Sequence, residues 1–146
     1  MSLSYLLVDG HNVMHAWPEL RRLQSHVGNR HLARLELLHR LRHLQDMTGT
    51  RVVVVFDGTQ AQSSEEREKD GLQIFYANAA STADSIIERL TAKYVHQFPL
   101  RVASADGMVR ETILALGADW ISPETLQALC ETAEADMRAK MKNSGS

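Results

Sequence analysis

Short runs of apolar residues alternate along the chain with longer segments that have helical spacing. The first run, Tyr5–Val8, is too short for a helix and has no polar alternation, so it predicts a strand buried on both faces. Arg51–Phe56 (RVVVVF) is the clearest strand of the chain. Leu100–Ala103 is a third short apolar run, Gln73–Tyr76 is a weaker one, and Asp119–Ile121 is the last.

The segments between these runs predict helices. One begins near Pro18, because proline suits a first helical turn. The next follows Asn29 as an N-cap and ends near Gly49. Further helices are predicted over 83–98, 108–116 and 123–141, with a polar surface loop over 59–71 and a frayed end from Lys142. The helix after Asn29 carries an apolar stripe of Leu32, Leu35, Leu37, Leu38, Leu41 and Leu44.

Strands and helices in this order predict a single α/β domain over residues 1–146. Its sheet is expected to be mostly parallel, with four or five strands and helices on both faces. The 146 residues suit one domain, and 44% apolar against 23% charged residues allow a real core and exclude a disordered chain.

Charge and cysteine content restrict the function classes. The net charge of −2 gives no global attraction for nucleic acid, so any nucleic-acid surface has to be local. The single cysteine, Cys130, allows no internal disulfide and is predicted to be a buried, unreactive thiol. The first apolar run has no charged region before it and ends early at Asp9, so we expect neither a signal peptide nor a membrane span, and a cytoplasmic protein.

Three of the apolar strands end in an acidic turn. The pairs are Asp9-Gly10, Asp57-Gly58 and, two residues beyond the strand, Asp106-Gly107. A single Asp-Gly pair after a strand is common, because both residues favour turns. Sites in open parallel sheets form outside the carboxyl ends of the strands, so we expect these three aspartates to converge on one crevice.

A further acidic pair opens the helix predicted from residue 83. Asp84 falls in the first turn, after Ser81 or Thr82 as a cap, and Glu88 lies at i+4 on the same face. Taken alone, Asp84 is equally well a helix-dipole acid and Glu88 a solvated residue. With the three strand-end aspartates, the set favours a site for Mg2+ or Mn2+, because several carboxylates in one crevice require a counter-charge.

Such a site suits the hydrolysis of phosphodiester bonds. A bound metal lowers the pKa of a water molecule and stabilises charge on the phosphate, so no protein nucleophile is required. Ser104 and Ser122 have no recognisable nucleophile elbow around them.

Several neighbouring polar residues have two interpretations. Asn12 either contacts water or phosphate or caps a helix, and Arg110, one turn after Asp106, is placed to reach a phosphate. The pairs His11/His15 and His39/His43 have zinc spacing but no third ligand, so we predict them to be solvated. The helix after Asn29 is basic, and its arginines form either an RNA contact or, as we favour, a charged outer face: Arg30, Arg34, Arg40 and Arg42.

These pieces together resemble an NYN domain of the PIN-like nuclease superfamily, in its YacP-like branch. The matching segments are Leu6–Asn12 with Ala16–Pro18, Val54–Gly58, Thr82–Glu88, Ala103–Asp106, and Gly117–Ala118 with Ile121–Ser122. No one segment is specific, but their order along nearly the whole chain is the family's order.

The resemblance implies a PIN-like, Rossmann-like fold, endoribonuclease activity with Mg2+ or Mn2+, and a substrate that looks like single-stranded messenger RNA engaged with the ribosome. It implies a catalytic acidic set of Asp9, Asp57, Asp84 and Asp106. Asp9, Asp84, Asp106 and the weaker Glu88 would be the metal ligands, with Asn12 as a polar helper.

The chain departs from the family pattern in three places. His11 replaces an aromatic residue, Val109 and Arg110 replace a polar pair, and a long basic C-terminal extension is missing. These departures leave the metal site intact but weaken the expectation of ribosome docking.

Two other functions compete with a nuclease. A catalytically silent domain that binds RNA or the ribosome would share the fold, but idle acids would cost stability and repel phosphate. A phosphatase would need a second acid two residues after its nucleophilic aspartate, and Asp9-Gly10-His11 lacks one.

Overall fold

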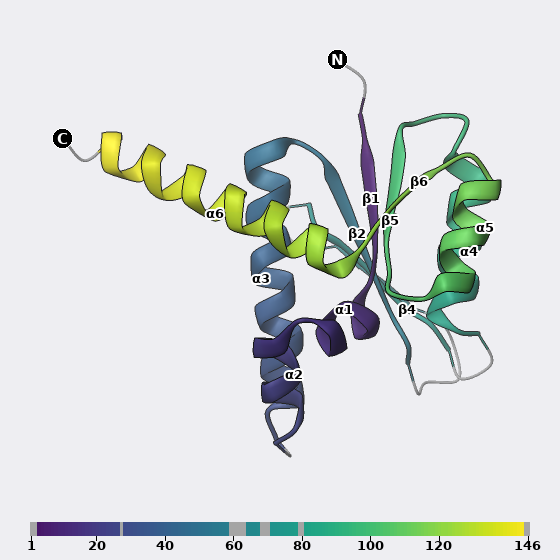
Figure 1. The fold of residues 1–146 in the computed structure, drawn as a ribbon, viewed down its shortest axis with the longest axis horizontal. Helices are drawn as coiled ribbons and strands as arrows, with labels where there is room; N and C mark the ends of the chain where they lie inside the picture. Colours follow the sequence, from purple (N-terminus) through teal and green to yellow (C-terminus); the bar gives the residue numbers. More distant parts are fainter. Residues whose placement is uncertain (1–2, 27, 59–63, 68–70, 79–80, 145–146) are drawn as a thin grey trace.

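The computed structural model describes residues 3–26, 28–58, 64–67, 71–78 and 81–144. Figure 1 shows the ribbon, with the helices arranged around a central sheet. In chain order the elements are β1 (Tyr5–Asp9), α1 (Gly10–Ala16), α2 (Pro18–Gln24), α3 (Arg30–Thr48), β2 (Arg51–Phe56), β3 (Ser64–Arg67), β4 (Gln73–Tyr76), α4 (Ala83–Tyr94), β5 (Leu100–Ala103), α5 (Gly107–Ala115), β6 (Asp119–Ile121) and α6 (Pro123–Ser144).

The sheet confirms the predicted mostly parallel architecture. Within the described residues it has six strands in the order β3-β4-β2-β1-β5-β6, and every neighbouring pair is parallel except β3 with β4. The prediction of a surface loop over 59–71 is wrong for Ser64–Arg67, which forms the antiparallel edge strand β3. Residues 59–63 and 68–70 of that predicted loop lie outside the described residues.

Helices cover both faces of the sheet, as predicted. In Figure 1, α3 and α6 lie on one side of the strands and α4 and α5 on the other. Successive side chains of a strand point to opposite faces, so Leu6 and Val8 pack with the first helix group while Leu7 packs with the second. This burial of both faces explains why the strands are short and almost entirely apolar.

The structure corrects some details of the predicted helices and confirms one of their ends. Helix α1 follows β1 directly at Gly10, whereas the helix predicted at Pro18 is α2. Gly49 does end α3, with a left-handed φ of 75° that glycine adopts at little cost. Helix α6 continues past Lys142, where the sequence predicted a frayed end, as far as Ser144, and residues 145–146 lie outside the described residues. In α3, Leu32 and Leu35 are 47% and 46% exposed, so the buried stripe is narrower than predicted.

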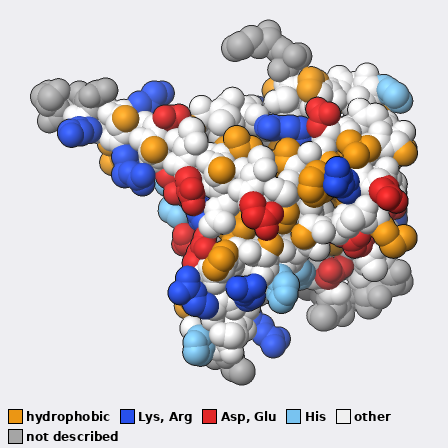
Figure 2. Space-filling view, viewed as in Figure 1, with side chains coloured by type: hydrophobic (Ala, Val, Ile, Leu, Met, Phe, Trp, Pro, Cys, Tyr) orange, Lys and Arg blue, Asp and Glu red, His pale blue; other side chains and the backbone are white. Residues whose placement is uncertain are grey.

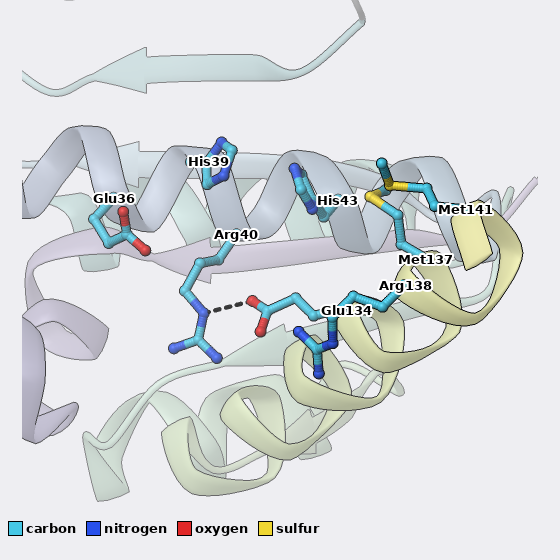
Figure 3. Close-up of a pocket in the computed structure, with 8 residues that line it drawn as sticks. All are labelled: Glu36, His39, Arg40, His43, Glu134, Met137, Arg138 and Met141. Carbon is cyan, nitrogen blue, oxygen red and sulfur yellow. Dashed lines mark hydrogen bonds and ion pairs between the residues drawn. The ribbon is translucent and has the colours of Figure 1, made fainter. Parts of the chain in front are cut away.

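Arg40 ties three helices together. Figure 3 shows it between α3 and α6, where its Nε donates to Oε1 of Glu134 at 2.8 Å. Its Nη1 donates to Oε1 of Glu19 on α2 at 2.8 Å, and its guanidinium lies 4.8 Å from the ring centroid of Trp17. The assignment of Arg40 to a charged outer face is therefore wrong, because the side chain is an internal cross-link.

Cys130 lies in the core beneath this cross-link, as predicted. Burial raises the pKa of its thiol to about 12, so the thiol stays protonated and unreactive. Among the described residues no helix combines the length and apolar character that a membrane crossing requires.

Candidate active site

The three strand-end aspartates meet at one edge of the sheet. Asp9 is the last residue of β1, Asp57 follows β2 directly, and Asp106 precedes α5 as its N-cap. Strands β2 and β5 flank β1 on either side and run parallel to it. Their carboxyl ends therefore lie next to each other, as the sequence predicted.

Asp84 joins these aspartates from α4. Asp9 and Asp84 lie close enough for each carboxyl group to affect the pKa of the other. Asp9 is only 3% exposed, and its pKa rises to about 7. Burial is the largest cause, and the negative charges of Asp84 and Asp57 add to it.

The pKa of Asp84 is affected by the other three aspartates. Burial is the largest cause of the raised pKa of Asp84, and the charges of Asp106 and Asp57 raise it further. The interaction with Asp9 partly offsets this rise, but the pKa of Asp84 remains raised overall. Burial and the repulsion between carboxylates therefore both disfavour negative charge at this edge of the sheet, and a bound cation would offset both.

Backbone amides fix the two outer carboxylates. Oδ1 of Asp57 accepts a hydrogen bond from the Ala83 amide at 2.8 Å, which joins the end of β2 to the start of α4. Oδ1 of Asp106 accepts from the amides of Met108 at 2.8 Å and Val109 at 3.3 Å, and so caps α5. These bonds use one oxygen of each carboxylate and hold the side chain in place.

Ser104 connects two of the aspartates. Its buried hydroxyl donates to Oδ2 of Asp9 at 3.3 Å and accepts from the amide of Asp106 at 3.1 Å. This positioning role of Ser104 was not predicted from the sequence, where the residue was weighed only as a nucleophile. Its place directly after β5 and two residues before Asp106 was the available signal, because a hydroxyl there can reach a neighbouring strand end.

The imidazole ring of His11 contacts Asp57. Its Nδ1 accepts a hydrogen bond from the Asp57 amide at 3.2 Å and lies 3.9 Å from Oδ2 of the same residue. Its ring contacts Phe56 edge-on at 5.3 Å between centroids. Burial lowers the pKa of His11, and the charge of Arg34 lowers it further, so the ring is neutral and able to accept. His11 is partly solvated, with 44% of its side chain exposed, and His15 is exposed as expected.

The two predicted substrate-binding residues, Asn12 and Arg110, lie in different surroundings. Oδ1 of Asn12 accepts a hydrogen bond from the Ala105 amide, so Asn12 bridges α1 to the end of β5 and keeps its amide nitrogen for other contacts. Arg110 is exposed and stacks over the Trp120 ring at 4.8 Å. The Trp120 indole in turn donates to the Ser104 carbonyl at 2.9 Å, which places this pair beside the acidic edge.

Glu88 extends the acidic face of α4 by one turn beyond Asp84. It lies one turn after Asp84 on α4 and is half-buried. The carboxylates that raise the pKa of Asp84 are Asp106 and Asp57, and Glu88 is not among them. An outer role, through a water molecule, is the one its position allows.

A hard divalent cation fits this set of donors. Among the described residues, no three His, Cys, Asp or Glu side chains are close enough, as they stand, to surround a metal directly. Magnesium usually takes only one or two protein carboxylates and completes its shell with water. Asp9 is buried and Asp84 is half-buried beside it, and a cation there would offset both their burial and their mutual repulsion.

The sheet order, the covering helices and the acidic edge define an α/β protein with a PIN-like, nuclease-like fold. The sequence pattern described as the YacP-like NYN domain matches residues 6–146, and the chain belongs to that family. NYN domains are generally nucleases.

Relatives from Bacillus subtilis are similar over almost the whole chain. The uncharacterized protein YacP is 29% identical over 143 residues, which cover 96% of this chain and 82% of YacP. The crystal structure of Rae1 (YacP) matches with a TM-score of 0.79 at 29% identity, covering 98% of this chain and 81% of that one. A tryptophan-to-leucine variant of Rae1 (YacP) matches with a TM-score of 0.82 at 29% identity, covering 97% and 83% of the two chains.

Proposed function

We propose that this protein is a divalent-metal-dependent endoribonuclease that hydrolyses phosphodiester bonds in single-stranded RNA. The observation that carries the proposal is the buried Asp9 carboxyl, which lies with Asp57, Asp84 and Asp106 at one edge of the sheet. Such a group stabilises the protein poorly by itself, but it suits the binding of a cation. Membership of the YacP-like NYN family supports RNA as the substrate.

The residues have separable roles in this proposal. Asp9, Asp84 and Asp106 hold Mg2+ or Mn2+, with Glu88 acting at longer range, and Asp57 closes the crevice on the β2 side. When bound, the cation lowers the pKa of a water molecule and stabilises the negative charge that develops on the phosphate. No enzyme-bound covalent intermediate forms, because the oxygen of water bonds to phosphorus while the bond from phosphorus to a ribose oxygen breaks.

Neighbouring groups hold the acidic side chains in position by hydrogen bonds. Ser104 orients Asp9 through its hydroxyl, and His11 with the Ala83 amide orients Asp57. Fixed carboxylates favour the metal because little reorganisation accompanies its binding. The family resemblance extends the proposal to messenger RNA in a ribosome-linked, cytoplasmic setting.

Cleavage of a labelled single-stranded RNA tests the proposal. The wild-type protein is compared with Asp84→Asn in Mn2+ or Mg2+ and in EDTA, and Asp136→Asn, an exposed acid on α6, is the matched control. We expect the wild type and Asp136→Asn to cut only with metal, and Asp84→Asn to lose about 100-fold or more, as expected for a metal ligand. Binding of RNA by the wild type without any metal-dependent cutting would contradict the proposal and indicate a binding domain.

A further inference from the structure

A basic hollow adjoins the acidic edge on the side of α1, α2 and α3. Its volume is about 480 Å³, and it is open to the surface. Two arginines and two histidines contribute to its wall, and none of the lining residues is acidic. The lining residues are His11, Met14, Gln24, Arg30, His31 and Arg34.

His11 links this hollow to the acidic edge. It lines the hollow and also accepts the hydrogen bond from the Asp57 amide. The charge of Arg34 acts on the His11 ring, and the Arg34 guanidinium lies 5.9 Å from the ring centroid of Tyr76. Tyr76 in turn stacks on Phe56, which is the last residue of β2, at 5.8 Å. Aromatic and positively charged side chains therefore lie next to one another between the end of β2 and the hollow.

The space-filling view shows the same grouping of charge. In Figure 2, Lys, Arg and His side chains gather over the lower ends of α2 and α3. Arg30 and His31 open α3, and the Asn29 side chain makes no capping hydrogen bond there. The dipole of the helix therefore adds partial positive charge to that of the arginines.

A second hollow of similar size has a lining of mixed charge. The hollow between α3 and α6 has a volume of about 460 Å³ and includes two glutamates, Glu36 and Glu134 (Figure 3). Its Arg40 is already paired with Glu134 and Glu19. Of these two hollows, only the one beside the acidic edge offers cations without carboxylates.

We propose that the hollow lined by Arg30 and Arg34 binds the backbone phosphates of the RNA strand next to the bond that is cut. The inference rests on the proposed function and assigns the binding surface for its substrate. The net charge of −2 and the four aspartates repel a phosphate chain, so RNA requires a local cationic surface that continues from the acidic edge. Arginine suits this task because its planar guanidinium matches two phosphate oxygens.

Binding of a labelled single-stranded RNA by the full chain in EDTA tests this surface without cleavage. The variant is Arg30→Gln/Arg34→Gln, and the matched control is Arg51→Gln/Arg138→Gln, which removes the same charge. Arg51 begins β2, at the opposite end from Asp57, and Arg138 lies on α6. Fluorescence anisotropy gives the dissociation constant at several salt concentrations.

The hollow variant is expected to bind RNA about tenfold more weakly or worse, while the control changes less than about twofold. The slope of log Kd against log salt should fall by about 1.4, since each lost phosphate contact on a single strand removes about 0.7. Equal losses in both variants would mean that only net charge matters, and this result would overturn the inference. The same holds if neither variant weakens binding, or if the wild type binds no RNA.

A single substitution and an NMR titration complement this binding measurement. Arg30→Gln alone changes an exposed residue at the start of α3, so it should fold normally and weaken RNA binding about threefold. In the wild type, the ring resonances of His11 and His31 should shift on addition of RNA. If inorganic phosphate at the same phosphate concentration shifts them equally, the hollow takes small anions and the inference fails.

The outcomes also separate this inference from the proposed function. A wild type that binds RNA through Arg30 and Arg34 but cuts nothing in Mn2+ would contradict the endoribonuclease and leave the binding surface standing. A wild type that cuts RNA, with binding unaffected by Arg30→Gln/Arg34→Gln, would contradict the binding surface alone.

Discussion

Replacing Asp9 by asparagine should stabilise the metal-free protein, and the gain should grow with pH. The pKa of Asp9 is about 7 in the folded protein, against an ordinary value of 3.8 that applies to the unfolded chain. Between these two values the folded protein binds more protons than the unfolded chain, so its free energy of unfolding falls as pH rises. The fall is complete above about pH 7, and at about 1.4 kcal/mol per pH unit it amounts to about 4 kcal/mol.

Asparagine has nearly the same shape as aspartic acid but carries no charge. The advantage of Asp9→Asn over the wild type should therefore grow by about 3 kcal/mol between pH 5 and pH 8. This figure is an upper bound, because Asp84 shares the interaction. Urea unfolding in EDTA, followed by the fluorescence of Trp17 and Trp120, measures the difference.

Two comparisons make the prediction specific. His11 has a lowered pKa, so its contribution to stability is lost as pH falls through the unfolded value of 6.5, but it is present in both proteins and cancels in their difference. Asp136→Asn, on the exposed part of α6, should show no such pH dependence. A stability difference between Asp9→Asn and the wild type that is equal at pH 5 and pH 8 would refute the electrostatic coupling at this site.

Three other substitutions test separate parts of the structure. Arg40→Met should lower the free energy of unfolding by about 3 kcal/mol in urea titrations, because its two glutamate partners lose their counter-charge. Gly10→Ala should cost about 1–3 kcal/mol by the same measurement, because the added Cβ overlaps the Phe56 ring. Ser104→Ala should weaken metal-dependent RNA cleavage by about 10-fold or more while the protein still folds, because Asp9 loses its positioning hydroxyl. Unchanged stability for the first two, or unchanged cleavage for the third, would contradict these assignments.

The local pattern of the sequence was sufficient to predict the acidic edge. Buried parallel strands are recognisable as short apolar runs, and the carboxyl ends of neighbouring parallel strands meet at one edge. The positions of Asp9, Asp57 and Asp106 follow from these two facts. Asp84 required one further step, because its helix had to start near the end of β2, where the Ala83 amide binds Asp57.

The supporting contacts were not predictable in the same way. His11 and Asp57 are 46 residues apart, and Ser104 and Asp9 are 95 apart. Contacts of this kind depend on which strands become neighbours and on side-chain direction, which local spacing does not encode. Arg40 shows the same limit, since arginine normally favours solvent and only its two partners on other helices explain its burial.

Edge strand β3 was missed for a different reason. Ser64–Arg67 has a polar, charged sequence, which is typical of a loop as well as of an edge strand exposed to water. An edge strand needs only one hydrogen-bonded neighbour, and β4 provides it. Hydrophobic pattern alone therefore could not separate the two possibilities.

Analysis of the RNA ends produced by the wild-type protein tests the central claim most directly. In 18O-labelled water with Mn2+, hydrolysis by a metal-bound water predicts one 18O atom in the phosphate of the new end and no 2′,3′-cyclic phosphate. EDTA should abolish the products. Cyclic phosphate ends would show that the ribose hydroxyl is the nucleophile, and cutting that continues in EDTA would show that no metal is required. Either result would contradict the account.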